Sequence, residues 1–174
     1  MSGLIHIYTG DGKGKTTSAL GLALRALGWG AKVCMIQFIK GYSEIGEIKF
    51  AKEFGENFNI YQFSIDIARC ISDEKVVNRC EEVQQAMDFA RDTINSGLYD
   101  LVILDEINNA VHFKLIEPAE VIKMLGQKPD NLEVVLTGRN AHPDIIEIAD
   151  YVTEMKLIKH PYQKNISARK MIDY

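Results

Sequence analysis

The chain has 174 residues, which at roughly 150 residues per domain predicts one domain with a substantial core and excludes a disulfide-stapled mini-protein. Its 24 acidic and 20 basic residues give a formal net charge of −4, which argues against a general affinity for nucleic acid or anionic membranes. Cys34, Cys70 and Cys80 form no C-x-x-C pair and fit no metal-binding spacing, a pattern typical of the reducing cytoplasm. No signal peptide or membrane span is expected, because no apolar run is long enough.

Strand-like and helix-like hydrophobic patterns alternate along the chain. The expected strands are residues 4–8, 32–38, 59–63, 101–104, 133–137 and 151–157. The expected helices are 16–27, one that ends near Gly55, 73–96, a short one after Asp105, 118–125 and 143–149. Strand 101–104 is apolar at every position, as burial on both faces of a parallel sheet requires. The alternation predicts an α/β fold, a mostly parallel sheet flanked by helices, in a single domain over residues 1–174.

A glycine-rich segment, residues 9–17, joins the first expected strand to the first expected helix and is called the phosphate loop below. Its glycines allow backbone N–H groups to converge on a phosphate, and the helix N-terminus adds partial positive charge. Lys15 is expected to reach terminal phosphates from a solvent-facing loop, and the Thr16 hydroxyl is expected to bind Mg²⁺. The loop departs from the pattern G-x-x-x-x-G-K-[ST] only at Thr9, because the first glycine falls one residue later. The candidate nucleotide-binding residues here are Thr9, Gly10, Asp11, Gly12, Lys13, Gly14, Lys15, Thr16 and Thr17.

Two carboxylates, Asp105 and Glu106, follow the apolar strand 101–104 in the Walker B pattern. The carboxyl ends of parallel strands meet at the edge where open α/β sheets bind their ligands. Mg²⁺ prefers hard oxygen ligands and keeps several waters, so one carboxylate is expected to bind the ion directly or through water. The pattern leaves open which of the two does so, and an acidic pair at this place also fits a capping or surface role.

Basic side chains outside Lys15 are further candidates for binding an anion. Arg139 follows strand 133–137, and its planar fork suits a phosphate. For Arg139 and for Lys13, a phosphate contact and a solvated side chain are equally open. Residues 156–170 contain several Lys and Arg residues but no Asp or Glu. This stretch either receives an anionic ligand or forms a solvated face.

Six segments of the chain together resemble the ATP:corrinoid adenosyltransferases of cobalamin biosynthesis and salvage. They are 8–17 (YTGDGKGKTT), 37–41 (QFIKG), 104–106 (LDE), 136–139 (LTGR), 149–154 (ADYVTE) and 159–160 (KH). In that family the first glycine of the phosphate loop is displaced as it is here. The resemblance spans residues 4–174 and implies a RecA-like P-loop NTPase fold.

The resemblance also implies a reaction, in which cobalt(I) of a reduced corrinoid attacks the 5′ carbon of ATP and expels triphosphate. Lys15, Thr16 and Glu106 would be the catalytic residues, with Mg²⁺ held by Thr16 and by Glu106 or Asp105. ATP and a reduced corrinoid are the expected substrates. An electron-transfer reductase or flavodoxin is the expected partner, and a homodimer in the cytoplasm is the expected assembly.

Family members carry two aromatic residues after the third strand that crowd the lower face of the corrinoid. The corresponding segment here is Gln62-Phe63-Ser64-Ile65-Asp66, so Phe63 is the predicted corrinoid contact and Ile65 the apolar replacement for the family's tryptophan. Taken without the resemblance, the motifs also fit a P-loop small-molecule or nucleoside kinase, or a non-catalytic nucleotide-binding switch.

Overall fold

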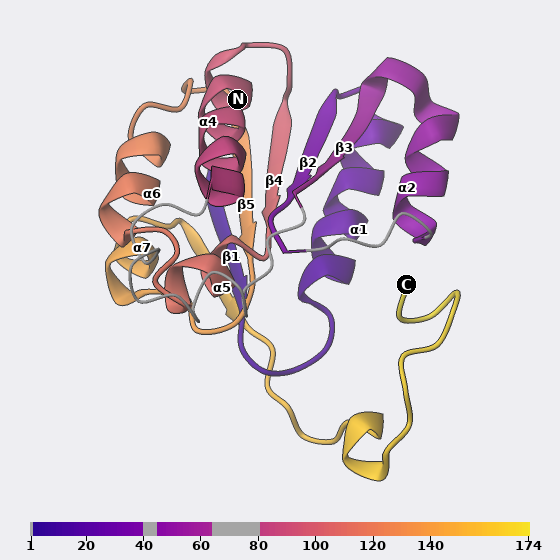
Figure 1. Ribbon diagram of the computed structural model, residues 1–174. Helices are drawn as coiled ribbons and strands as arrows, with labels where there is room; N and C mark the ends of the chain where they lie inside the picture. The colour runs from indigo at the N-terminus through magenta and orange to yellow at the C-terminus, as the bar shows by residue number, and fades with distance from the viewer. Residues whose placement is uncertain (1, 40–44, 64–80) are drawn as a thin grey trace.

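A six-stranded parallel sheet runs through the centre of the molecule (Figure 1). The computed structural model describes residues 2–39, 45–63 and 81–174. The strands are β1 (Ile5–Thr9), β2 (Val33–Gln37), β3 (Phe58–Gln62), β4 (Leu101–Asp105), β5 (Glu133–Thr137) and β6 (Tyr151–Glu154). They lie in the order β3-β2-β4-β5-β1-β6, so β1 lies between β5 and β6. The prediction of an α/β fold with a mostly parallel sheet is confirmed.

Helices cover both faces of the sheet (Figure 1). One face carries α1 (Lys15–Gly28), α2 (Gly46–Ala51) and the 3-10 helix η1 (Lys52–Asn57). The other carries α4 (Glu81–Asn95), α5 (Ile107–His112), α6 (Pro118–Leu125) and α7 (Pro143–Glu147). A last 3-10 helix, η2 (Pro161–Lys164), lies in the segment that follows β6.

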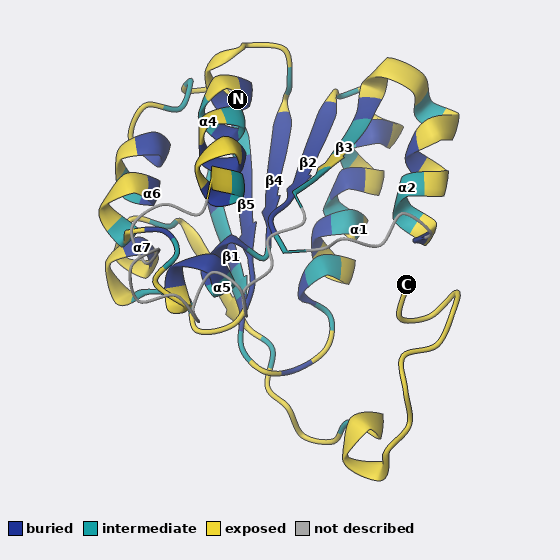
Figure 2. Cartoon of the chain, in the orientation of Figure 1, coloured by how far each residue is buried: buried dark blue, intermediate teal, exposed yellow. Residues whose placement is uncertain are grey.

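The central strands are buried on both faces, and their side chains divide between two apolar clusters (Figure 2). In β4, Ile103 packs on the side of α1, and its neighbour Leu104 packs on the side of α4. On the α1 side, Ala19 and Ala23 are small enough for the helix to lie close to the sheet. Burial at every position explains why these strands read as uninterrupted apolar runs.

The elements agree with those expected from the sequence, with differences at their ends. The long helix predicted over 73–96 is helical over Glu81–Asn95, and residues 73–80 lie outside the described residues. Cys34 is buried in β2, and burial raises the pKa of its thiol to about 12, as suits an inert structural cysteine. Cys70 and Cys80 also lie outside the described residues. None of the described helices has the length and hydropathy needed to cross a bilayer.

The last strand is shorter than predicted, because the expected strand 151–157 ends at Glu154. The Met155 N–H still donates to the Thr9 carbonyl at 2.8 Å, but the Met155 carbonyl accepts from the Gly12 N–H at 2.6 Å. The chain therefore pairs with the phosphate loop at this point instead of continuing along β1. Beyond it, residues 156–174 leave the sheet as an exposed arm, called the C-terminal segment below (Figures 1 and 2).

This close approach makes Gly12 a structural requirement. A Cβ atom on Gly12 would lie 2.6 Å from the Met155 carbonyl oxygen, whereas a Cβ on Gly21 in α1 would meet nothing within 4 Å. We therefore expect Gly12→Ala to lower the free energy of unfolding by about 1–3 kcal/mol through overpacking. Gly21→Ala is the matched control and should raise it by about 0.5–1 kcal/mol, because alanine favours a helix. Urea unfolding measures both, and equal stability of Gly12→Ala and wild type would contradict the tight packing.

Candidate nucleotide-binding site

The site lies where β1, β4 and β5 end side by side at the carboxyl edge of the sheet. The phosphate loop follows β1, the acidic pair follows β4, and Gly138 and Arg139 follow β5. Because all strands are parallel, these three connections meet at one edge. The register brings together residues that are about 30 to 130 positions apart in the sequence.

The phosphate loop turns sharply from β1 into α1. Gly10 and Gly14 adopt φ values of 91° and 126°, which favour glycine. Gly14 occupies the N-cap of α1, where it offers no capping side chain, and the first helical turn carries no acidic residue. The positive end of α1 therefore remains available to an anion.

Lys15 is buried, although the sequence predicts that it belongs to a solvent-facing loop. Its ammonium group donates hydrogen bonds to the carbonyls of Gly10 at 2.7 Å and Gly12 at 2.8 Å. Burial lowers the pKa of Lys15, and the nearby Glu106 carboxylate opposes this shift. The phosphate loop encloses Lys15 because the carbonyl groups of Gly10 and Gly12 point toward its ammonium group. A sequence motif does not reveal the direction of these carbonyl groups.

Asp105 ties the strand ends to α1. It is fully buried, and its Oδ1 atom accepts hydrogen bonds from the Thr16 hydroxyl at 2.8 Å and the Thr137 hydroxyl at 2.7 Å. The Gln37 amide lies 3.4 Å from its other oxygen, and the Gln62 amide donates to Gln37 at 2.8 Å. Hydrogen bonds from four neighbouring elements thus reach one buried carboxylate directly or through one intermediate.

Glu106 takes a different place from Asp105. Its φ of 66° is uncommon for a residue other than glycine and turns the chain from β4 into α5. The Glu106 carboxylate accepts from the Asn109 side-chain amide, and the Asn109 carbonyl oxygen accepts from the Arg139 N–H at 2.6 Å. Arg139 itself lies 3.7 Å from the Asp11 carboxylate. Asn109 therefore links the loop after β4 to the loop after β5.

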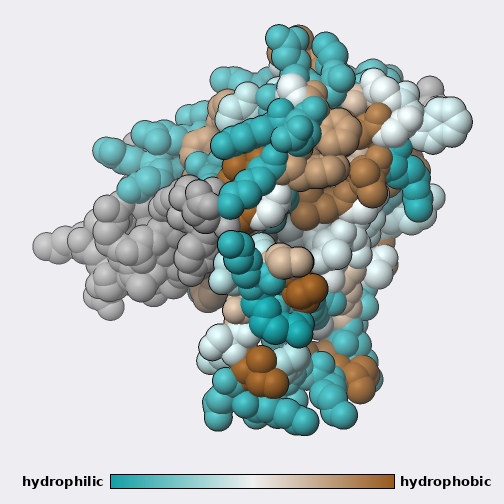
Figure 3. All heavy atoms as spheres, turned by 90° about the vertical axis from the view of Figure 1, so that its right-hand side faces the viewer, coloured by the Kyte–Doolittle hydropathy of each residue, from teal (hydrophilic) through white to brown (hydrophobic). Residues whose placement is uncertain are grey.

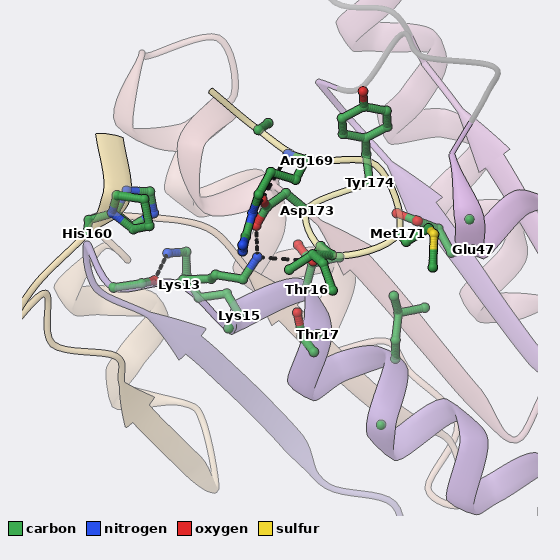
Figure 4. A pocket seen from close by; sticks show the side chains of 18 of the residues that line it. Lys13, Lys15, Thr16, Thr17, Glu47, His160, Arg169, Met171, Asp173 and Tyr174 are labelled. Atoms are coloured by element: carbon green, nitrogen blue, oxygen red, sulfur yellow. Dashed lines mark hydrogen bonds and ion pairs between the residues drawn. The ribbon is translucent and has the colours of Figure 1, made fainter. Parts of the chain in front are cut away.

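These loops line a pocket of about 860 Å³ (Figure 4). The predicted site residues in its wall are Asp11, Gly12, Lys13, Gly14, Lys15, Thr16, Thr17, Glu106 and Arg139. The others, Thr9, Gly10, Asp105 and Phe63, are not part of the wall formed by the described residues. Thr9 supports the site, because its hydroxyl accepts from the Ala141 N–H at 3.2 Å. Asp105 supports it through Thr16.

Phe63 lies beyond the end of β3, away from the phosphate loop. Its N–H donates to the Gln37 carbonyl at 2.8 Å, and its ring centroid lies 5.6 Å from that of Phe89 on α4. It is partly buried against the larger apolar cluster. The predicted corrinoid contact of Phe63 stays a prediction, and Ile65 lies outside the described residues.

Sequence reasoning missed several residues of the pocket and its support. Glu47 and Phe50 of α2 line the wall, as do Tyr162 and Asp173 of the C-terminal segment. Asn109, which links Glu106 to Arg139, was also missed, although its position three residues after an acidic pair places it on the first turn of α5. Arg169, which also lines the wall, belongs to the basic stretch 156–170 for which the sequence left an anion-binding role open. Asp173 belongs to no motif, and its contact with Lys13 of the phosphate loop spans 160 positions of sequence.

The oxygen ligands available suit Mg²⁺ better than a transition metal. Among residues 2–39, 45–63 and 81–174, no group of three or more His, Cys, Asp or Glu side chains is placed to hold a metal ion. The site offers instead the Thr16 hydroxyl and two carboxylates. Mg²⁺ is often held by few protein oxygens, with water and phosphate completing its shell, so this set fits a nucleotide-bound ion.

Comparisons with known proteins agree with the motifs. The model of the family described as ATP:corrinoid adenosyltransferase BtuR/CobO/CobP matches residues 1–174. A corrinoid adenosyltransferase of Escherichia coli (strain K12) is 37% identical over 99% of this chain and 86% of its own length. One from Sinorhizobium sp is 40% identical over 99% of this chain and 80% of its own length, and the corrinoid adenosyltransferase CobA of Salmonella typhimurium is 35% identical over 99% and 86%. The resemblance found in the sequence is confirmed, and the chain belongs to the ATP:corrinoid adenosyltransferase family.

Proposed function

We propose that this protein binds Mg²⁺-ATP in the phosphate loop and transfers the 5′-deoxyadenosyl group to cobalt(I) of a reduced corrinoid, releasing triphosphate. The observation that carries the proposal is the set of cations around one pocket. Lys13, Lys15 and Arg139 all line it, together with the N-terminal turn of α1. In a chain with a net charge of −4, this local positive charge favours a polyanion.

The proposed reaction is a nucleophilic substitution at carbon. The cobalt(I) electron pair forms the cobalt–carbon bond, the bond between C5′ and its oxygen breaks, and triphosphate leaves with the bonding electrons. Negative charge therefore grows on the leaving triphosphate, where Lys13 and Lys15 stabilise it most strongly in the transition state. The nucleophile is supplied by the corrinoid, so the reaction requires no protein base.

Mg²⁺ belongs to the same proposal, with Thr16 and Glu106 as its protein ligands. When bound, the ion neutralises phosphate charge and fixes the triphosphate in place. Glu106 lines the pocket, whereas Asp105 is fully buried and accepts from Thr16. We therefore assign Asp105 the task of orienting the Thr16 hydroxyl and Glu106 that of meeting the ion or its water.

Positioning supplies the remaining acceleration. The ribose C5′ atom must be held in line between cobalt and the leaving oxygen. Binding both substrates in this orientation lowers the entropic cost of bringing them together. Phe63 and the basic part of the C-terminal segment are the candidates for holding the corrinoid. The 860 Å³ pocket has room for ATP, and the corrinoid approaches from its open side.

The surroundings of the enzyme are also proposals. We propose a single-domain cytoplasmic protein that receives electrons for cobalt(I) from a reductase or flavodoxin and that forms a homodimer. Support for a dimer comes from the turn after α1, where Trp29 is 90% exposed. Sedimentation of the purified protein tests this assembly, and a monomer at micromolar concentration contradicts it.

Anaerobic incubation with chemically reduced corrinoid, ATP and Mg²⁺ tests the reaction. We expect a light-sensitive cobalt–carbon product and one triphosphate for each corrinoid consumed. ADP formed only with an acceptor molecule would indicate a kinase instead. Nucleotide-dependent binding of a partner without any corrinoid product would indicate a switch.

Replacing Lys15 tests the role of the phosphate loop. Lys15→Met keeps the apolar stem but removes the ammonium group, so we expect ATP affinity to fall about ten- to hundredfold, the range of a charge-assisted hydrogen bond. The free energy of unfolding should fall by about 1–3 kcal/mol, because the hydrogen bonds to the Gly10 and Gly12 carbonyls are lost. Isothermal titration calorimetry and urea unfolding measure the two effects. Lys32→Met, at an exposed lysine before β2, is the control, and near wild-type affinity of folded Lys15→Met would contradict the assignment.

Replacing Glu106 tests the metal site through binding alone. Mg²⁺ should strengthen ATP binding by the wild-type protein, and Glu106→Gln should reduce this strengthening by about tenfold because a charged oxygen ligand is lost. ATP titrations with and without Mg²⁺ measure the difference. Glu120→Gln, on the exposed surface of α6, is the control. An unchanged dependence on Mg²⁺ in Glu106→Gln would remove Glu106 from the site.

A further inference from the structure

The C-terminal segment closes one side of the nucleotide pocket. After η2 it returns toward α1 and α2, and its residues 166–169 and 171–174 form part of the pocket wall (Figures 1 and 4). The rest of the wall comes mainly from the phosphate loop, α1 and α2, with Glu106 and Arg139 from the loops after β4 and β5. A segment far from any nucleotide-binding motif in the sequence therefore reaches the place where the phosphates are proposed to bind.

Asp173 lies between two cations at this wall. Its carboxylate accepts a hydrogen bond from the Lys13 ammonium group, and Lys13 also donates to the Ile172 carbonyl at 3.2 Å. The other Asp173 oxygen accepts from the Arg169 N–H at 2.9 Å and from the Arg169 guanidinium at 3.2 Å. Figure 4 shows Lys13, Asp173 and Arg169 joined in this way. The Lys13 ammonium group holds the pKa of Asp173 well below its usual range, so the carboxylate is ionised at neutral pH.

The chemistry of this cluster matches that of a bound phosphate. An ionised carboxylate and a phosphate both present acceptor oxygens to ammonium and guanidinium donors. Lys13 belongs to the phosphate loop, and both Lys13 and Arg169 line the pocket. Asp173 is the single acidic residue between Glu154 and the last residue, Tyr174, in a stretch otherwise rich in Lys and Arg.

We propose that Asp173 is an internal substitute for a nucleotide phosphate. In the absence of ATP, the Asp173 carboxylate binds Lys13 and Arg169. When ATP displaces this carboxylate, Arg169 becomes available as an additional phosphate-binding residue. The inference rests on the proposed binding of ATP at the phosphate loop. Asp173 and a phosphate of ATP compete for Lys13, because two anions at one ammonium group repel each other. Triphosphate has several charges and more acceptor oxygens, so it displaces the single carboxylate.

The segment is built so that it can be displaced. Its residues remain largely exposed, including Tyr162 at 78%, Met171 at 88% and Ile172 at 59%. Figure 3 shows apolar side chains, in brown, beside polar ones, in teal, on the surface at the lower end of the molecule, where Figure 1 places η2. Few apolar contacts therefore hold it, and segments of this kind open at low cost. The ion pair at Lys13 is itself partly exposed, and exposed pairs contribute little to stability.

Calorimetric titration with Mg²⁺-ATP tests the proposal. Asp173→Asn keeps the size of the side chain and removes its charge, so we expect ATP to bind about two- to fivefold more tightly, the range in which an exposed ion pair competes. In the Asp173→Asn background, Arg169→Gln should weaken ATP binding again. The increase in ATP affinity caused by Asp173→Asn should be smaller in a Lys13→Gln background, because Asp173 and ATP compete for Lys13.

A matched control and a second ligand separate this inference from its premise. Asp88→Asn removes the charge of another exposed carboxylate paired with an arginine, on α4, and should leave ATP affinity unchanged. Inorganic triphosphate should gain affinity in Asp173→Asn as ATP does, whereas adenosine should not. Unchanged or weaker ATP binding in Asp173→Asn, or an equal gain for adenosine, would overturn the role of Asp173. Absence of ATP binding to the wild-type protein would instead defeat the proposed function.

Discussion

The buried carboxylate of Asp105 is the interaction on which the arrangement of the site depends. Ionised groups are costly to bury unless hydrogen bonds replace their water, and here hydroxyls from Thr16 and Thr137 do so. Thr137 also accepts from the Glu106 N–H at 3.0 Å, so the ends of β4 and β5 are fixed relative to each other. Since Thr16 lies in the first turn of α1, the same carboxylate ties the start of this helix, and with it the phosphate loop, to the end of β4.

This arrangement explains why two adjacent carboxylates have different tasks. Asp105 is the last residue of β4 and points into the sheet edge, where donors already surround it. Glu106 takes a left-handed backbone conformation, and its carboxylate lies in the pocket wall. A one-residue difference in position thus separates a carboxylate that positions a hydroxyl from one that can meet a metal ion.

The sequence predicted the strands and helices well because burial on two faces leaves an apolar pattern that β4 and β5 show without interruption. It also predicted which loops meet, because the edge of a parallel sheet follows from strand direction alone. It could not predict that Lys15 is buried, since this depends on two carbonyls of the loop turning inward. Nor could it place Asp173, whose partner Lys13 lies 160 positions away and in no shared motif.

The two ends of the C-terminal segment are both attached to the phosphate loop, and this gives the loop more than one role. Met155, the residue just before the segment, accepts a hydrogen bond from the Gly12 N–H, and Asp173 attaches the other end of the segment to Lys13. The first attachment uses backbone groups and a contact too close for any side chain, so nucleotide binding does not replace it. The second uses charge, which a triphosphate supplies in larger amount. ATP can therefore displace Asp173 from Lys13 while the backbone hydrogen bond between Gly12 and Met155 keeps the C-terminal segment next to the phosphate loop.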